Sequence, residues 1–213
     1  GLPEQINRSQ FLTPRVTRDQ LKDAITRPAE LFGWRIAPDL TNQILNDVVR
    51  HQDQLPLMQH ALLRVWQLVK QDSPARRSRK DGDVLTLTDY ERPRVGGLRN
   101  ALSNHADEVY SELSAVERRV CKVMFQSLSE PDEEQRVTRR LSTISEVAKV
   151  ANVDHATVER VVKAFSGPGR SFIVRHADGS LDISHESLLR RWKRLEEWIN
   201  EEEKSAGIYR HLA

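Results

Sequence analysis

Four capping boxes divide most of this chain into short helices. In a capping box, a Ser or Thr side chain accepts a hydrogen bond from the backbone three residues on, and a Glu or Gln there bonds back, so each box marks a helix start. The sequence has such boxes at residues 17–20, 88–91, 114–117 and 143–146. Apolar residues at helical spacing accompany them. The pattern therefore predicts a mainly α fold.

Residues 1–72 are expected to form a small helical bundle. The first helix follows the box at 17–20, with Pro28 expected to break or kink it and Gly33 to end it. A second helix follows Pro38, and a third begins at Leu55-Pro56-Leu57, where proline suits a first helical turn. The expected buried positions of the three helices are Leu21, Ala24, Ile25, Leu31, Leu40, Ile44, Leu45, Val48, Val49, Met58, Ala61, Leu62, Val65 and Val69.

Residues 73–97 are expected to be a linker that contains one short helix. The stretch from Ser73 to Asp83 is basic and shows no periodicity, which indicates an exposed loop. It has no aromatic residues between its charges, so we assign it no nucleic-acid role. The box at 88–91 predicts a short helix that Pro93 ends, and Gly96-Gly97 marks a turn.

Residues 98–204 show the order of elements that is typical of a winged helix. Helices are expected from Leu98 and after the box at 114–117, followed by an acidic loop at 130–135. Two more helices, one from the box at 143–146 and one capped by Asp154, precede strands at 171–175 and 181–184 that a turn at Asp178-Gly179 connects. One long closing helix is then expected from residue 188, with residues 205–213 as a C-terminal connector.

The composition excludes several classes of site. Cys121 is the only cysteine, which rules out structural disulfides and thiolate metal clusters, and the seven histidines contain no HxxxH pair for zinc. No apolar run approaches membrane-spanning length and no signal-peptide pattern is present. We therefore expect a cytoplasmic protein that makes no membrane contact.

The motifs for nucleotide chemistry are missing from the chain. It contains no Walker loop, no Rossmann GxGxxG and no GxSxG, so the chain alone is not expected to be an enzyme. A winged helix also suggests a DNA-binding transcriptional regulator. The formal charge is only +2, and the second helix of the pair carries Asp154 and Glu159 beside Arg160 and Lys163. Nucleic-acid binding is therefore the less favoured alternative.

His185 is the candidate ligand-binding residue that the pattern itself indicates. It follows a predicted strand at the start of the closing helix. Free N–H groups at a helix start favour an anion and disfavour a charged imidazolium, so a neutral His185 could hydrogen-bond a phosphate. Most histidines at helix starts bind nothing, and this simpler interpretation stays open.

The order of several motifs resembles one family over nearly the whole chain. These motifs are GLPEQINR at 1–8, FLTPR at 11–15, QLPLMQHAL at 54–62, LTDY at 87–90, HADEVY at 105–110, PGRSF at 168–172 and DISHESL at 182–188. Together they resemble the region after the catalytic core in novel STAND NTPases, the signal-transduction ATPases with numerous domains of bacterial regulatory proteins.

This resemblance implies a helical lid followed by a winged helix, next to an upstream P-loop core. It implies that ADP or ATP with Mg²⁺ is bound by the core of the parent protein, which would be a slow ATPase switch, and that this chain alone binds none tightly. Pro56 matches the proline of the family's Gly-x-Pro lid motif, which lies near the adenine, although Gln54 replaces the glycine. His185 matches the winged-helix histidine that contacts the β-phosphate of ADP. We leave His60, one turn after Pro56, outside this site.

The implied function is to clamp the nucleotide and convert its state into domain rearrangement during signalling. A downstream repeat sensor such as a WD40 domain and homo-oligomers on activation are the further partners implied. A protein-interaction scaffold that no longer switches is a third alternative. The lid is also expected to be apolar on the face that the core covers.

Overall fold

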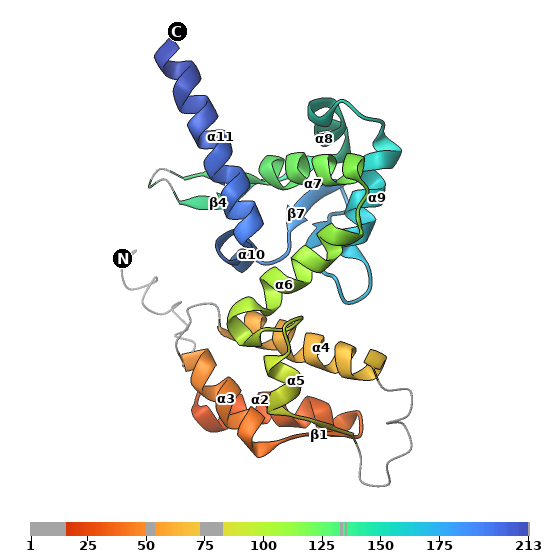
Figure 1. Ribbon diagram of the computed structural model, residues 1–213, viewed down its shortest axis with the longest axis vertical. Coiled ribbons are helices and arrows are strands. Elements are labelled where there is room, and N and C mark those ends of the chain that lie inside the picture. Colours follow the sequence, from red (N-terminus) through yellow and green to blue (C-terminus); the bar gives the residue numbers. More distant parts are fainter. Residues whose placement is uncertain (1–15, 50–53, 73–82, 133, 135, 213) are drawn as a thin grey trace, which may run out of the picture.

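The computed structural model describes residues 16–49, 54–72, 83–132, 134 and 136–212, and within them the chain is mainly α with short strands, as predicted. Residues 73–82 of the predicted linker and the motifs at 1–8 and 11–15 lie outside the described residues. Figure 1 shows a bundle of helices at one end and a second group of helices and strands at the other. The elements of the bundle are α2 (Arg18–Leu31), β1 (Trp34–Ile36), α3 (Pro38–Val49), α4 (Gln54–Asp72), β2 (Asp83–Leu85) and α5 (Leu87–Glu91).

The bundle also contains two short parallel strands, which pair with each other. Trp34, Arg35 and Ile36 of β1 pair with Asp83, Val84 and Leu85 of β2. The backbone N–H of Ala37 extends this ladder to the carbonyl of Leu85. The pairing brings the chain after residue 82 back beside α2, so that α5 packs on α3 and α4.

Helix α6 (Gly97–Glu112) connects the two ends of the molecule (Figure 1). It packs along α4 of the bundle and also contacts α9 (His155–Ser166) and α10 (Ser187–Arg191) at the other end. Tyr90 holds its first turn: the Tyr90 hydroxyl accepts a hydrogen bond from the backbone N–H of Leu98 and donates one to Asp47. Tyr90 is buried, so this junction belongs to the core of the bundle.

The C-terminal half has the helix–helix–hairpin order that led to the winged-helix prediction. The elements of this half are α7 (Ala115–Ser127), β3 (Ser129–Pro131), β4 (Val137–Arg139), β5 (Ser142–Thr143), α8 (Ile144–Ala151), α9 (His155–Ser166), β6 (Ile173–Arg175), β7 (Ser180–Ile183), α10 (Ser187–Arg191) and α11 (Lys193–Leu212). Strand β5 precedes the helix pair α8 and α9, and the hairpin of β6 and β7 follows it. The three strands form one sheet with the order β5-β7-β6, antiparallel throughout.

An aromatic cluster forms the centre of this half. The ring of Trp192 meets Phe125 edge-on with 4.9 Å between centroids and lies 5.9 Å from Phe165. The indole N–H of Trp192 donates to Asp107 of α6 at 3.0 Å, and Nε of Arg194 donates to the same oxygen at 2.8 Å. A buried indole normally needs such an acceptor, so Asp107 fixes α6 against the start of α11.

Three capping boxes are confirmed and one is displaced. The side chains of Thr17, Ser114 and Thr143 each accept from the backbone N–H three residues on, and their own backbone N–H groups donate to the side chain there. The box predicted at 88–91 is wrong, because Thr86 and Asp89 form the box two residues earlier. Thr86 follows β2 directly, so the helix starts where the strand ends.

The break that was the first alternative at Pro28 is absent, because α2 continues to Leu31. Two further expectations are wrong. The predicted acidic loop at 130–135 begins inside a hairpin, in which β3 pairs antiparallel with β4. The single closing helix is two helices, because Trp192 leaves the helical conformation (φ −83°, ψ 100°) to place its ring in the core. No helix among the described residues combines the length and the apolar character that a bilayer crossing needs.

Candidate functional site

His185 lies between the wing sheet and α10, and it is partly buried. The neighbouring backbone is fixed, since Ser184 donates from its N–H to Phe172 and the His185 carbonyl accepts from the N–H of Leu188 at 2.9 Å. Burial lowers the pKa of His185, and the positive charge of Arg139 lowers it further. The imidazole is therefore neutral at pH 7. The helix that follows has five residues only, so the long-helix dipole expected from the sequence is absent here.

Pro56 lies in the first turn of α4 and is exposed. Leu57 and Met58 are buried and fix this turn in the core of the bundle. Pro56 thus has the predicted place at a helix start, with its ring open to contact from outside the chain.

A histidine pair lies one turn further along α4. Nε2 of His60 is 3.3 Å from Nδ1 of His105 on α6, and both rings pack on Phe172 beside the wing, with centroids 5.6 and 5.0 Å away. Burial lowers the pKa of His60 to about 4, and the charge that His185 carries when protonated and the charge of Arg64 lower it further. The histidine that we assigned to the site therefore lies within electrostatic range of the one that we left out.

Burial also keeps His105 neutral. Burial lowers its pKa to about 3, helped by the charge of Arg64. Its ring is 2% exposed. Two neutral imidazoles can share one N–H···N hydrogen bond, whereas two imidazolium ions at this distance would repel each other. The hydrogen bond between α4 and α6 therefore requires that at least one of the two rings is neutral.

An ion-pair network continues from the histidines along α6. Glu108 accepts from Arg64 of α4 with one oxygen and from Nη2 of Arg94 with the other, at 2.7 Å for Arg94. Burial raises the pKa of Glu108, but the hydrogen bonds from Arg94 and Arg64 outweigh it and lower the pKa to about 2. A polar cavity of about 400 Å³ opens beside this network, between α4, α6 and the loop after α9.

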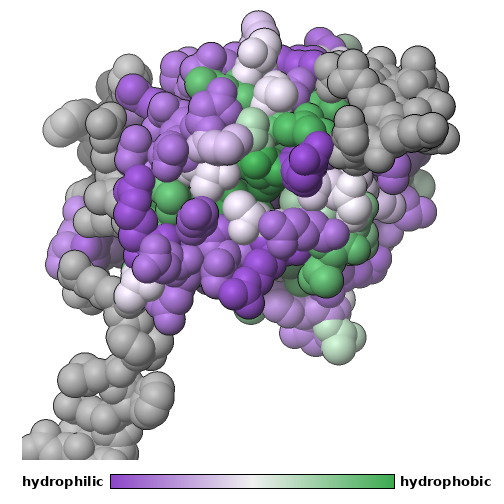
Figure 2. Space-filling view, turned by 90° about the horizontal axis from the view of Figure 1, so that it is seen from below, coloured by the Kyte–Doolittle hydropathy of each residue, from purple (hydrophilic) through white to green (hydrophobic). Residues whose placement is uncertain are grey.

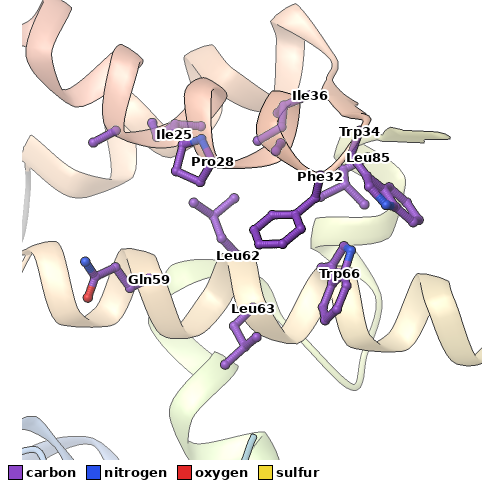
Figure 3. A pocket seen from close by; sticks show the side chains of 12 residues that line it. Ile25, Pro28, Phe32, Trp34, Ile36, Gln59, Leu62, Leu63, Trp66 and Leu85 are labelled. Atoms are coloured by element: carbon purple, nitrogen blue, oxygen red, sulfur yellow. The ribbon is translucent and has the colours of Figure 1, made fainter. Parts of the chain in front are cut away.

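A second cavity, an apolar groove of about 470 Å³, lies on the bundle between α2, the two strands and α4 (Figure 3). Hydrophobic residues gather within a hydrophilic rim at this end of the molecule (Figure 2). Phe32 is 77% and Leu63 42% exposed, which is unusual for side chains of this size. The groove is lined by Ala24, Ile25, Pro28, Ala29, Phe32, Trp34, Ile36, Gln59, Leu62, Leu63, Trp66 and Leu85.

Helix α4 places Pro56 between the histidine pair and the groove. At 3.6 residues per turn, Pro56 and Leu63 lie on one stripe of the helix. His60 lies on one flank of that stripe, toward Phe172, and Gln59 and Leu62 lie on the other flank, toward the groove. A partner that touched Pro56 from outside would therefore cover groove residues and approach the histidines as well.

Sequence reasoning missed His105, and it predicted an apolar face on the lid without locating the groove, for the same reason. His105 sits in a regular helical pattern, and only its packing against His60, 45 residues earlier, distinguishes it. The groove needs α2, two strands and α4 together. Within the described part of the chain, no group of three His, Cys, Asp or Glu side chains is arranged to hold a metal ion.

Comparison with known proteins agrees with the motif order. A family model described as Novel STAND NTPase 1 matches residues 1–213, the whole chain given. No curated protein and no solved structure matches the chain. The chain belongs to the novel STAND NTPase 1 family.

Proposed function

We propose that this chain is the lid and winged-helix region of a STAND NTPase, and that it closes over a nucleotide held by a P-loop core elsewhere in the same polypeptide. The observation that carries the proposal is that α4 and the segment before His185 meet at Phe172. The ring of His60, one turn after Pro56, packs on the ring of Phe172, and the N–H of Ser184 donates to the Phe172 carbonyl. This arrangement supports a shared ligand-facing surface. Family membership supports the coarser part of the proposal.

The residues present fit a bound ADP or ATP. His185 is neutral and partly exposed, so one ring nitrogen can donate to a phosphate oxygen without the cost of burying a second charge. Pro56 offers a rigid apolar surface suited to a purine base. The nucleotide, with Mg²⁺, would supply the bond that is hydrolysed. This chain supplies orientation and closure, and by itself it is expected to hydrolyse nothing.

The apolar groove is the surface that we assign to the core. Leu63 belongs to the groove and to the exposed stripe that carries Pro56. A core that presents a nucleotide to Pro56 would therefore also bury Leu63 and Phe32. Burial of such a patch stabilises an interface by roughly 25 cal/mol per Å² of apolar surface removed from water.

Release of the His185 contact is the switch in this proposal. With ADP bound, His185 ties the wing to the core, and exchange for ATP removes that tie and frees the wing for self-association or for a downstream repeat sensor. A ligand shifts such an equilibrium only by its difference in affinity for the two states. His185 provides that difference because it contacts the ligand in one state alone.

The charge distribution argues against the DNA-binding alternative. The cations expected to meet phosphates are engaged with carboxylates: Arg160 with Glu117 at 2.9 Å, and Arg175 with Glu159 at 3.1 Å. Duplex binding requires free cations to neutralise phosphates. DNA binding would first have to break these pairs.

The variant Leu63→Glu tests the docking of the core, in the longer polypeptide that contains the P-loop. A charge on the exposed stripe should prevent closure and speed release of a fluorescent ADP about tenfold or more, because a charge is costly to bury at an apolar contact. Val150→Glu on α8 is the matched control, since Val150 is 67% exposed and lies outside both the groove and the histidine pair. Equal release rates in the two variants would refute the assignment of the groove.

A further inference from the structure

The polar cavity beside the histidine pair carries more positive than negative charge. It lies where α4 and α6 meet the loop that follows α9. The charged and amide side chains that line it are Arg64, Gln67, Gln71, Glu108, Lys163 and Arg170. Three of these are Lys or Arg and one is a carboxylate.

The carboxylates near the cavity are already occupied. Glu108 accepts from Arg94 with both oxygens, and its Oε2 also accepts from Arg64. Arg170 donates to Glu112 at 2.5 Å. Two carboxylates are therefore set against three guanidinium groups and the ammonium of Lys163, which leaves an excess of about two positive charges.

Arg64 is short of acceptors. Its side chain is 4% exposed and carries five N–H donors, yet its hydrogen-bond acceptor among the described residues is Glu108 alone. Its Nε is buried without a partner. Buried guanidinium groups are normally saturated, so a shortage at a polar cavity indicates an acceptor that protein atoms do not provide.

Lys163 adds a second donor at the cavity. It lies in the last turn of α9, is exposed, and has no acceptor within the described part of the chain. A buried guanidinium, a free ammonium and the amides of Gln67 and Gln71 form a set of donors that suits a multiply charged oxyanion.

We infer that this cavity binds a phosphate group, supplied by inorganic phosphate or by a larger phosphate ester such as ADP. The bound group would complete the acceptors of Arg64 and bridge α4 to the loop after α9. The inference concerns this chain alone and does not depend on the proposed closure over a core.

Calorimetric titration of the 213-residue chain with inorganic phosphate, at constant ionic strength, tests the inference. Lys163→Gln should weaken phosphate binding about tenfold, because the variant loses one hydrogen bond to a charged group. Lys149→Gln, the same change in the last turn of α8, should leave the affinity unchanged. Phosphate should also raise the unfolding temperature of the parent chain more than that of Lys163→Gln.

A parallel titration with ADP separates the two sources of the phosphate group. Tighter binding of ADP, with the same loss in Lys163→Gln, assigns the cavity to a phosphate ester, and equal or weaker binding assigns it to the free anion. No binding of either probe at millimolar concentration would show that water satisfies Arg64 and would overturn the inference. Equal weakening by Lys163→Gln and Lys149→Gln would overturn it too.

Discussion

At the scale of single residues, the histidine pair makes the stability of the chain depend on pH. The pKa values of His60 and His105 are lowered to about 4 and about 3, from an ordinary value of 6.5. Between pH 6.5 and 4 the unfolded chain binds protons that the folded chain does not. The free energy of unfolding must therefore fall as the pH falls through this window, and it is fully retained above pH 6.5.

We expect each histidine to lower the free energy of unfolding by up to about 1.4 kcal/mol for each pH unit that the pH falls in that window. Urea unfolding at several values between pH 5 and 7 measures it, a range that lies above the titration of ordinary carboxylates. The double variant His60→Gln, His105→Gln should have a flatter profile, while His176→Gln in the exposed wing turn should not. An unchanged slope in the double variant would contradict neutral burial of the pair.

Some site residues could be predicted from the neighbouring sequence, and others depend on packing between distant segments. Pro56 could be placed from sequence because proline in a first helical turn is a local pattern. His185 could be placed after a strand, but the break at Trp192 could not, since it depends on a pocket between Phe125 and Phe165. The role of His60 was missed because its partners come from α6 and the wing.

At the scale of elements, the capping boxes account for much of what could be predicted. The Ser114 hydroxyl accepts from the N–H of Glu117, whose carboxylate bonds back to Ser114 at 3.0 Å. These bonds depend on neighbouring residues alone, so the sequence predicts them well. The prediction of a box at 88–91 was wrong because the box of Thr86 and Asp89 starts the helix instead. Thr86 follows β2 directly, so the helix begins two residues earlier than predicted.

Removal of one cap should have a measurable cost. Ser114→Ala should lower the free energy of unfolding by about 1 kcal/mol, because the N–H of Glu117 loses its acceptor at the start of α7. Ser145→Ala inside α8 is the matched control, since Ser145 is exposed and should change stability by less than about 0.5 kcal/mol. Equal losses in the two variants would show that the Ser114 box does not stabilise the helix.

The short strands mark the limit of element prediction. β1 and β2 are three residues each, and their parallel pairing joins segments 49 positions apart. β3 and β4 are equally short and carry charged residues that gave no alternating pattern. Strands of this length are defined by their partners rather than by their own composition, which is why the sequence showed none of the four.

At the scale of the whole molecule, α6 makes one cooperative unit of the two ends. It packs along α4, and its Asp107 binds Trp192 and Arg194. The domain boundary predicted at residue 98 falls at the start of this shared helix and remains a prediction. Loss of either end would expose the buried face of α6, so we expect both ends to unfold together.

The four tryptophans allow this to be measured. Trp34 and Trp66 lie in the bundle, and Trp192 and Trp198 lie in the C-terminal half. In the double variant Trp34→Phe, Trp66→Phe, fluorescence reports the C-terminal half alone while circular dichroism reports the whole chain. We predict the same urea midpoint for both signals. Separate midpoints would show that α6 does not couple the two ends.

The central claim, that His185 holds the closed state through a bound nucleotide, is tested most directly by the rate of ADP release from the longer polypeptide that contains the P-loop. His185→Ala should speed release about tenfold, the loss of one hydrogen bond to a charged group, with the stability of the chain retained because the side chain is only partly buried. His155→Ala, an exposed histidine at the start of α9, is the control and should release ADP at the parent rate. The same rate in His185→Ala as in the parent protein would contradict the account.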